Sequence, residues 1–118
     1  MASAIKDIEI EALIDKEYEQ AVKRFGNNHS RHESYAVLKE EIEEAKEELE
    51  NIEEMLESIW ANTKSNAVES NVADQFHFIK QKALKLAIES IQVAAVARKG
   101  QMFERGEFCD NRRNIRNV

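Results

Sequence analysis

Apolar residues recur at every third or fourth position along most of this chain, the spacing that gathers side chains on one face of an α-helix. In the first 25 residues this pattern includes Ile5, Ile8, Ala12, Tyr18, Val22 and Phe25. It predicts a helix over residues 4–25, followed by Gly26 at a position where a left-handed C-terminal cap is favoured. β-branched and aromatic residues show no sustained alternation, so no strand is predicted.

A second helix is predicted from about Ser30 to Trp60. Ser30 and Glu33, three residues apart, form the sequence pattern of a capping box at a helix start. The apolar stripe of this helix consists of Leu38, Ile42, Ala45, Leu49, Ile52, Leu56 and Ile59. The polar residues within 61–67 predict a loop after it.

A third helix is predicted over residues 68–99. Its first half has one apolar face, formed by Val72, Phe76, Ile79, Ala83 and Leu86. Between Leu86 and Ala97, nine of twelve residues are apolar, which is typical of a helix buried on most sides. Gly100 is expected to end this helix, and residues 101–118 are expected to form a basic C-terminal tail.

Composition agrees with long helices. The chain has 118 residues, enough for one domain, with no proline and only three glycines. The sequence therefore predicts an all-α fold in which long antiparallel helices form a bundle, with a single domain over 1–100. Three long helices in so short a chain leave a thin core, so we expect a homo-oligomer, dimer or tetramer, to complete it.

Charge and hydropathy limit the partners and the location. The formal net charge of −6 argues against stable nucleic-acid binding, which usually needs a basic surface. The N-terminus lacks the pattern of a signal peptide, and no apolar run approaches the roughly 18 residues that span a bilayer. We therefore expect a cytoplasmic protein with no membrane partner.

The second helix carries an unusual excess of acid. Between Glu33 and Glu57 there are eleven glutamates and only two lysines. On a helical wheel Glu41 lies at the border of the apolar stripe, with Glu44 and Glu48 on the same side. Like charges this close repel one another and favour a bound cation, and hard divalent ions prefer carboxylate oxygens. A solvated acidic face is the alternative interpretation.

Glu89 is a carboxylate inside the apolar part of the third helix, with Gln92 one turn further on the same face. Burying an unpaired carboxylate costs several kcal/mol, so Glu89 needs a cation or a partner, and Lys85 is one candidate partner. If the two helices face each other, Glu41, Glu44, Glu89 and Gln92 meet. Such a group can hold Mg²⁺, or Mn²⁺, with water and phosphate oxygens as the other ligands.

Two stretches of the chain carry a resemblance. HESYAVLKEEIEE (32–44) and AIESIQVAAVAR (87–98) resemble the MazG-like all-α NTP pyrophosphohydrolases, above all their short phage-type members. That family has an E-E-x-x-E motif on one helix and an E-x-x-D motif on a later one. The resemblance covers about residues 25–98 and implies Mg²⁺-dependent hydrolysis of an NTP or dNTP to the monophosphate and pyrophosphate.

The first family motif is matched in full by Glu40, Glu41 and Glu44, and Glu89 matches the start of the second. The resemblance implies that Glu41, Glu44 and Glu89 bind the metal, and that Glu40 is an outer ligand or the base that orients water. Gln92 stands where the family has aspartate, and a neutral amide binds Mg²⁺ more weakly. The alternative is therefore a non-catalytic binding or assembly protein that keeps the MazG-like fold.

Three further residues are candidate substrate contacts. Lys82 and Lys85 lie on the side of Glu89 at helical spacing, where they could meet a triphosphate. His32, near the start of the second predicted helix, could contact the substrate or a neighbouring subunit. The alternatives are a solvated helix face for the lysines and a purely structural histidine.

Overall fold

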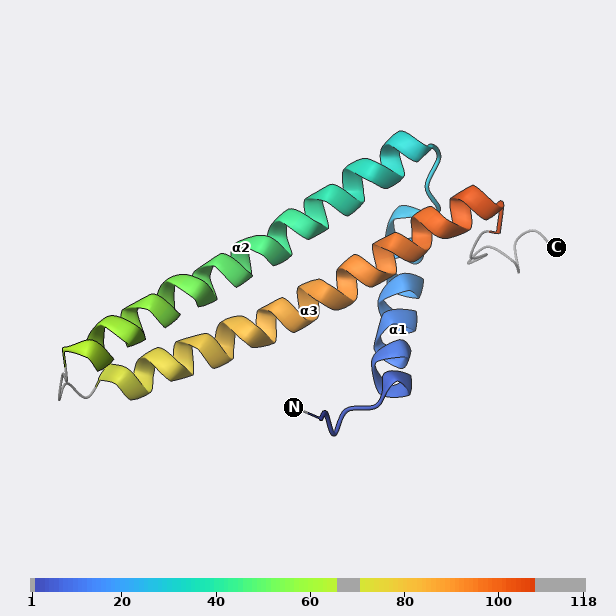
Figure 1. Ribbon diagram of the computed structural model, residues 1–118. Helices are drawn as coiled ribbons and strands as arrows, with labels where there is room; N and C mark the ends of the chain where they lie inside the picture. The colour runs from blue at the N-terminus through green and yellow to red at the C-terminus, as the bar shows by residue number, and fades with distance from the viewer. Residues whose placement is uncertain (1, 66–70, 108–118) are drawn as a thin grey trace. The chain divides into compact units, whose positions relative to one another are not determined.

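Three helices make up nearly all of the part of the chain that the computed structural model describes, residues 2–65 and 71–107 (Figure 1). They are α1 (Asp7–Phe25), α2 (Arg31–Lys64) and α3 (Asn71–Arg105). No strand occurs within the described residues, so the all-α prediction is confirmed. None of these helices has both the length and the apolar character needed to cross a membrane.

Helix α1 begins at Asp7 rather than Ala4, because local hydrogen bonds fix its first turn there. The Lys6 backbone N–H donates to the Glu9 carboxylate at 3.1 Å. The helix ends at Phe25, as predicted, where the Gly26 N–H donates to the Val22 carbonyl at 2.7 Å. Gly26 has a φ of 75°, which favours glycine, but its ψ of −177° lies outside the left-handed helical region expected for the cap.

Helix α2 starts at the predicted N-cap. The Glu33 backbone N–H donates to Ser30 Oγ at 3.0 Å, which satisfies one of the free donors of the first turn. The return hydrogen bond differs from a capping box, because the Glu33 carboxylate accepts from the His29 N–H, at 3.3 Å. Hydrogen bonds among His29, Ser30 and Glu33 thus cap the start of α2.

The predicted loop over 61–67 is wrong for residues 61–64, which belong to α2, while residues 66 and 67 lie outside the described part. Polar side chains of this last turn have hydrogen-bond partners. Asn62 Nδ2 donates to Gln75 Oε1 at 2.9 Å, and Thr63 Oγ1 donates back to the Ile59 carbonyl at 2.8 Å. These polar residues therefore make hydrogen bonds from within the helix, and they do not mark its end.

Helix α3 passes through Gly100 and continues to Arg105, so the predicted end at Gly100 is wrong. A Cβ at Gly100 would lie 3.4 Å from Ser34 Cβ, so the absence of a side chain lets α3 approach the start of α2 closely. The helix ends instead before Gly106, whose φ is 69°. The first five residues of the predicted tail are therefore helical, and residues 108–118 lie outside the described part.

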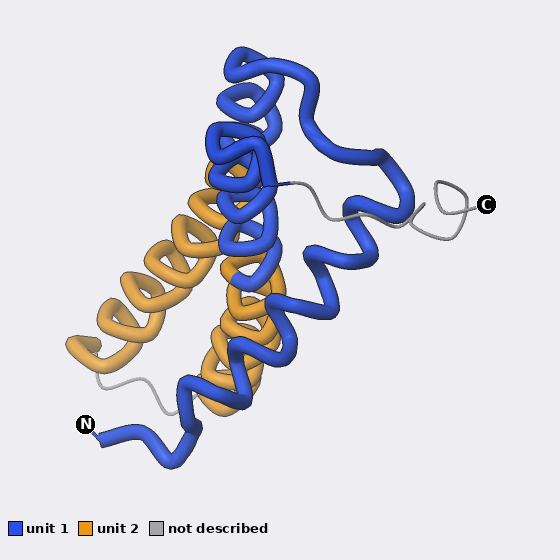
Figure 2. The backbone as a smooth tube through the Cα atoms, turned by 90° about the vertical axis from the view of Figure 1, so that its right-hand side faces the viewer, with its two compact units in different colours: residues 1–41, 91–118 blue, residues 42–90 orange. Residues whose placement is uncertain are grey.

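The chain divides into two compact units: residues 1–41 with 91–118, and residues 42–90 (Figure 2). The core of the first unit consists of Tyr18, Val22 and Ala95, with Met102 packed against it. The Arg98 guanidinium lies 5.2 Å from the centre of the Tyr18 ring and pairs with Asp15 at 2.5 Å. This cation is thus held between an aromatic face and a carboxylate.

The second unit is an antiparallel hairpin of residues 42–64 of α2 and 71–90 of α3. Gln75 contacts both Ser58 and Asn62, and Lys82 lies near Glu48. Two inner lines of less exposed residues face each other: Ala45, Glu48, Ile52, Met55, Ile59 and Asn62 on α2, and Val72, Gln75, Ile79, Lys82, Leu86 and Glu89 on α3. Among the described residues of this unit only Ile59 is buried, so its core is thin.

Candidate metal centre

Carboxylates from α2 and α3 meet near the end of the hairpin that holds Glu44 and Glu89. Glu41 precedes Glu44 by one turn of the continuous helix α2. One oxygen each from Glu41, Glu44 and Glu89 lies within 4.8 Å of the other two. The structure thus brings together three of the four residues that the sequence predicts as metal ligands.

Glu89 is the most perturbed acid of this group. Burial raises the pKa of the Glu89 carboxyl above its usual range, and its hydrogen bond with Glu44 and the charges of Glu44 and Glu48 raise it further. Its Oε2 is buried and has no hydrogen-bond partner within the described residues. Two carboxyl groups that share a hydrogen bond need a proton or a cation between them, so either a proton or a bound cation would satisfy this arrangement.

Glu48 extends the cluster and was not among the predicted ligands. Its Oε2 lies 3.5 Å from Lys82 Nζ, and both side chains are about one-fifth exposed. The sequence holds a signal for it, because Glu48 continues the spacing of Glu41 and Ala45 along the line that faces α3. Its charge is partly offset by Lys82.

Lys82 and Lys85 were expected to meet a triphosphate. The structure places the Lys82 ammonium beside Glu48 and 5.6 Å from the centre of the Phe78 ring. Lys85 is exposed, and the alternative that it pairs with Glu89 is not seen in the described part, where Glu89 bonds to Glu44 instead. Contact of either lysine with a substrate stays a prediction.

The other predicted residues lie around this group without being brought into it by a contact. Glu40 is exposed on α2, next to Glu41, and Gln92 is half-buried one turn after Glu89 on α3. His32 is exposed and precedes Glu41 by nine residues, about 13 Å along the helix. A role for His32 near the carboxylates would therefore require a long ligand or another copy of the chain.

The carboxylate group suits Mg²⁺, which binds through a few carboxylates and keeps several waters. No family model, curated protein or solved structure matches the chain. The likeness to the MazG-like pyrophosphohydrolases therefore stays a prediction, and the chemistry of Glu41, Glu44 and Glu89 is what supports a metal there.

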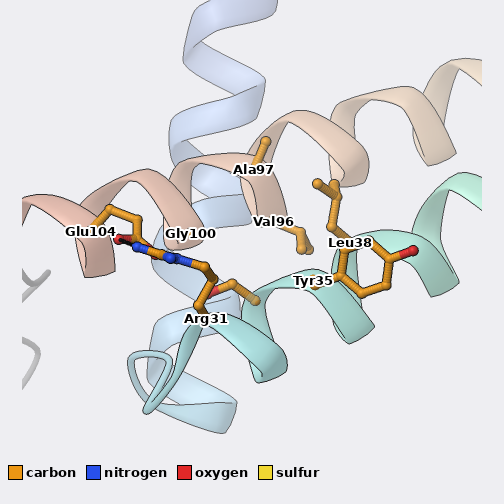
Figure 3. Close-up of a pocket in the computed structure, with 8 residues that line it drawn as sticks. Arg31, Tyr35, Leu38, Val96, Ala97, Gly100 and Glu104 are labelled. Carbon is orange, nitrogen blue, oxygen red and sulfur yellow. Dashed lines mark hydrogen bonds and ion pairs between the residues drawn. The ribbon is translucent and has the colours of Figure 1, made fainter.

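A second feature lies in the first unit, where the start of α2 and the end of α3 line an open, largely apolar pocket of about 280 Å³ (Figure 3). Arg31, at its edge, donates two hydrogen bonds to the Glu104 carboxylate, at 2.7 and 2.9 Å. This pair raises the pKa of Arg31 and lowers the pKa of Glu104. Since Arg31 is engaged by Glu104, the pocket offers a ligand mainly apolar contact.

The raised pKa of Glu89 predicts a link between pH and metal. The folded protein binds this proton more tightly than the unfolded chain, so metal-free stability should fall as pH rises from about 4.3 through the raised pKa. Mg²⁺ binds the ionised carboxylate, so its stabilising effect should be smaller at about pH 5 than at about pH 8. Thermal melts with Mg²⁺ or EDTA at both pH values measure this.

The matched control for these melts is Glu89→Gln, which cannot titrate. This variant should lose both the fall in stability caused by Glu89 and most of the difference between Mg²⁺ and EDTA. An equal effect of Mg²⁺ at both pH values would contradict a site built on Glu89.

Proposed function

We propose that this protein is a Mg²⁺-dependent nucleoside triphosphate pyrophosphohydrolase, which converts an NTP or dNTP to the monophosphate and pyrophosphate. The observation that supports it best is the group of three carboxylate oxygens within 4.8 Å, together with the buried Oε2 of Glu89 that lacks a hydrogen-bond partner. The resemblance of 32–44 and 87–98 to the MazG-like family supports the choice of reaction.

In this proposal Glu41, Glu44 and Glu89 bind the ion and fix its position between α2 and α3. A bound Mg²⁺ would supply Lewis-acid activation of a phosphate and of the attacking water. Glu40 lies next to Glu41 on the exposed side of α2, where its carboxylate can accept the proton of that water. The water oxygen would bond to the α-phosphorus while the bond from that phosphorus to the bridging oxygen breaks, so that the monophosphate forms and pyrophosphate leaves.

One residue favours a second candidate function, a non-catalytic protein that binds or assembles. Gln92 supplies a neutral amide one turn after Glu89, where the proposed enzyme family has a carboxylate. A site with one fewer negative charge holds Mg²⁺ and its phosphate ligands less firmly. The two candidates differ in whether bound metal leads to turnover.

A nucleotide panel separates the two candidates. The purified protein is incubated with canonical and modified NTPs and dNTPs, with Mg²⁺ or Mn²⁺, and pyrophosphate and monophosphate are measured. We expect release of both products from at least one substrate. A rise in melting temperature with metal but no turnover would favour the binding protein. The absence of both a rise and turnover would refute the metal centre itself.

Gln92→Asp tests the departure from the family motif. Adding the missing carboxylate should raise metal affinity, and turnover if the enzyme proposal holds, by about tenfold. Ser90→Asp is a matched control, because Ser90 is exposed and next to Glu89 in sequence, but turns away from it on the helix. Equal effects of the two substitutions would indicate that only net charge matters.

A further inference from the structure

Large apolar side chains form an exposed line along one flank of the hairpin. Ile42, Leu49 and Leu56 on α2 are spaced by seven residues and are 47%, 45% and 54% exposed. They lie about a quarter of a turn from the line of α2 residues that faces α3. The contact between α2 and α3 therefore leaves them uncovered.

Helix α3 contributes apolar residues to the same side. Phe76, which is 56% exposed, and Ala83 lie about a quarter of a turn from the inner line of α3. Each helix's exposed residues are rotated from its own inner line in the same direction, as viewed from the N-terminus of that helix. Because α2 and α3 are antiparallel, equal rotations bring both sets to one side. We define this apolar face by Ile42, Leu49, Leu56, Phe76 and Ala83.

The opposite side of the hairpin is mainly polar, although Phe78 of α3 also lies on it. Its residues include Glu44, Glu47, Asn51 and Ser58 on α2, and Asp74, Gln81 and Lys85 on α3. Glu44 and Glu89 are rotated toward this polar side, away from the apolar face. A partner on the apolar face would therefore leave the carboxylates open.

We propose that the apolar face is covered by the same face of a second copy of this chain, with the two α2 helices antiparallel and the two-fold axis beside Leu49. The line is symmetric about that residue, since Ile42 lies seven positions before it and Leu56 seven after it. Antiparallel pairing thus places Leu49 against Leu49 and Ile42 against Leu56 of the other copy. Such self-complementarity is what a two-fold interface requires.

Charges beside the line support the same pairing. Lys46 and Glu53 are both exposed and flank the line, three residues before and four after Leu49. In the antiparallel pairing Lys46 of each copy lies beside Glu53 of the other. A parallel pairing would set Lys46 against Lys46 and Glu53 against Glu53, and like charges at such flanking positions disfavour association.

The size of the face also suits a stable dimer. Residues 42–64 of α2 extend for about 34 Å, and two helices side by side are about 20 Å wide. The face then offers roughly 700 Å² on each copy, or about 1,400 Å² in total, within the range of stable interfaces. The hairpin alone buries only Ile59 among its described residues, so a second copy supplies the core that it lacks.

Leu49→Glu and Leu84→Glu form a matched pair that tests this interface. Leu84 is 59% exposed and lies on the side of α3 away from α2, outside the apolar face. Sedimentation at several concentrations should show that Leu49→Glu raises the dissociation constant at least about 100-fold, because each copy loses a buried leucine. Leu84→Glu should leave it unchanged, and circular dichroism should show equal helix content in both.

Two further variants fix the orientation. Lys46→Glu and Glu53→Lys should each weaken association, and the double variant should restore it. In a Cys109→Ser background, Leu49→Cys should form a disulfide-linked dimer across the axis, whereas Leu84→Cys should not.

A monomeric wild-type protein, equal effects of the two glutamate variants, or cross-linking through position 84 alone would overturn the interface. None of these measurements depends on nucleotide turnover. Failure of the interface and failure of the proposed activity are therefore distinguishable.

Discussion

Glu89→Gln should abolish pyrophosphate release and, in the absence of metal, raise the melting temperature. The amide keeps the size of the side chain but removes the charge that burial and Glu44 disfavour. Turnover should fall at least about 100-fold, equivalent to about 2.7 kcal/mol of transition-state stabilisation. The metal-free protein should gain about 1 kcal/mol, or roughly 4 °C, because a half-buried carboxylate no longer has to ionise.

The control for this variant is Glu47→Gln, an exposed glutamate of α2 on the polar side of the hairpin. It should change neither turnover nor melting temperature appreciably. Glu41→Gln should share the loss of turnover, because it removes another of the three grouped carboxylates. If turnover survives Glu89→Gln, the protein is an enzyme but its metal ligands lie elsewhere.

Tyr18→Ala should lower the free energy of unfolding by about 3–5 kcal/mol, a large part of the 5–15 kcal/mol typical of a small protein. Tyr18 is 7% exposed and forms the first unit's core with Val22 and Ala95. Its ring also lies against the Arg98 guanidinium. The substitution leaves a cavity and removes the aromatic face from that cation. Urea denaturation followed by circular dichroism measures the change.

Ile8→Ala is the matched control for Tyr18→Ala, because Ile8 lies on the same helix and is 76% exposed. It should change the free energy of unfolding by no more than about 0.5 kcal/mol. Similar losses in both variants would mean that the first unit is not held together by the contacts of Tyr18.

Helical spacing predicted the three helices because their apolar residues repeat every three or four positions. It failed at Gly100 and at residues 61–64 for a common reason. Gly100 packs close to Ser34, and Asn62 donates a hydrogen bond to Gln75. The residue type at each position is therefore explained by a contact with another helix, which local spacing does not show. The pair of Arg31 and Glu104, 73 residues apart, is likewise invisible to local spacing.

The candidate site was predictable to the extent that it follows helix geometry. Glu41 and Glu44 share a side of α2, and the lone charge of Glu89 predicted a cation or a partner, with Lys85 of the same helix as one candidate. Which partner it finds depends on the register of the two helices, and that register pairs Glu89 with Glu44 rather than with its own helix neighbour Lys85.

The apolar stripe of α2 was predicted as one set, but the structure separates it into two lines. Ala45, Ile52 and Ile59 belong to the inner line that faces α3, while Ile42, Leu49 and Leu56 are exposed. Both lines repeat every seven residues, so spacing alone cannot distinguish a contact within the chain from one with a second copy.

Gly100 also lowers the local stability of the end of α3. A glycine inside a helix costs about 0.5–1 kcal/mol relative to alanine, so the hydrogen bonds around it open more readily than those of neighbouring turns. Beyond it, the exposed pair of Arg31 and Glu104 links this segment to the start of α2. Dissolved salt screens such pairs. The order of the last turn of α3 should therefore follow the ionic strength of the solution more closely than the helix interior does.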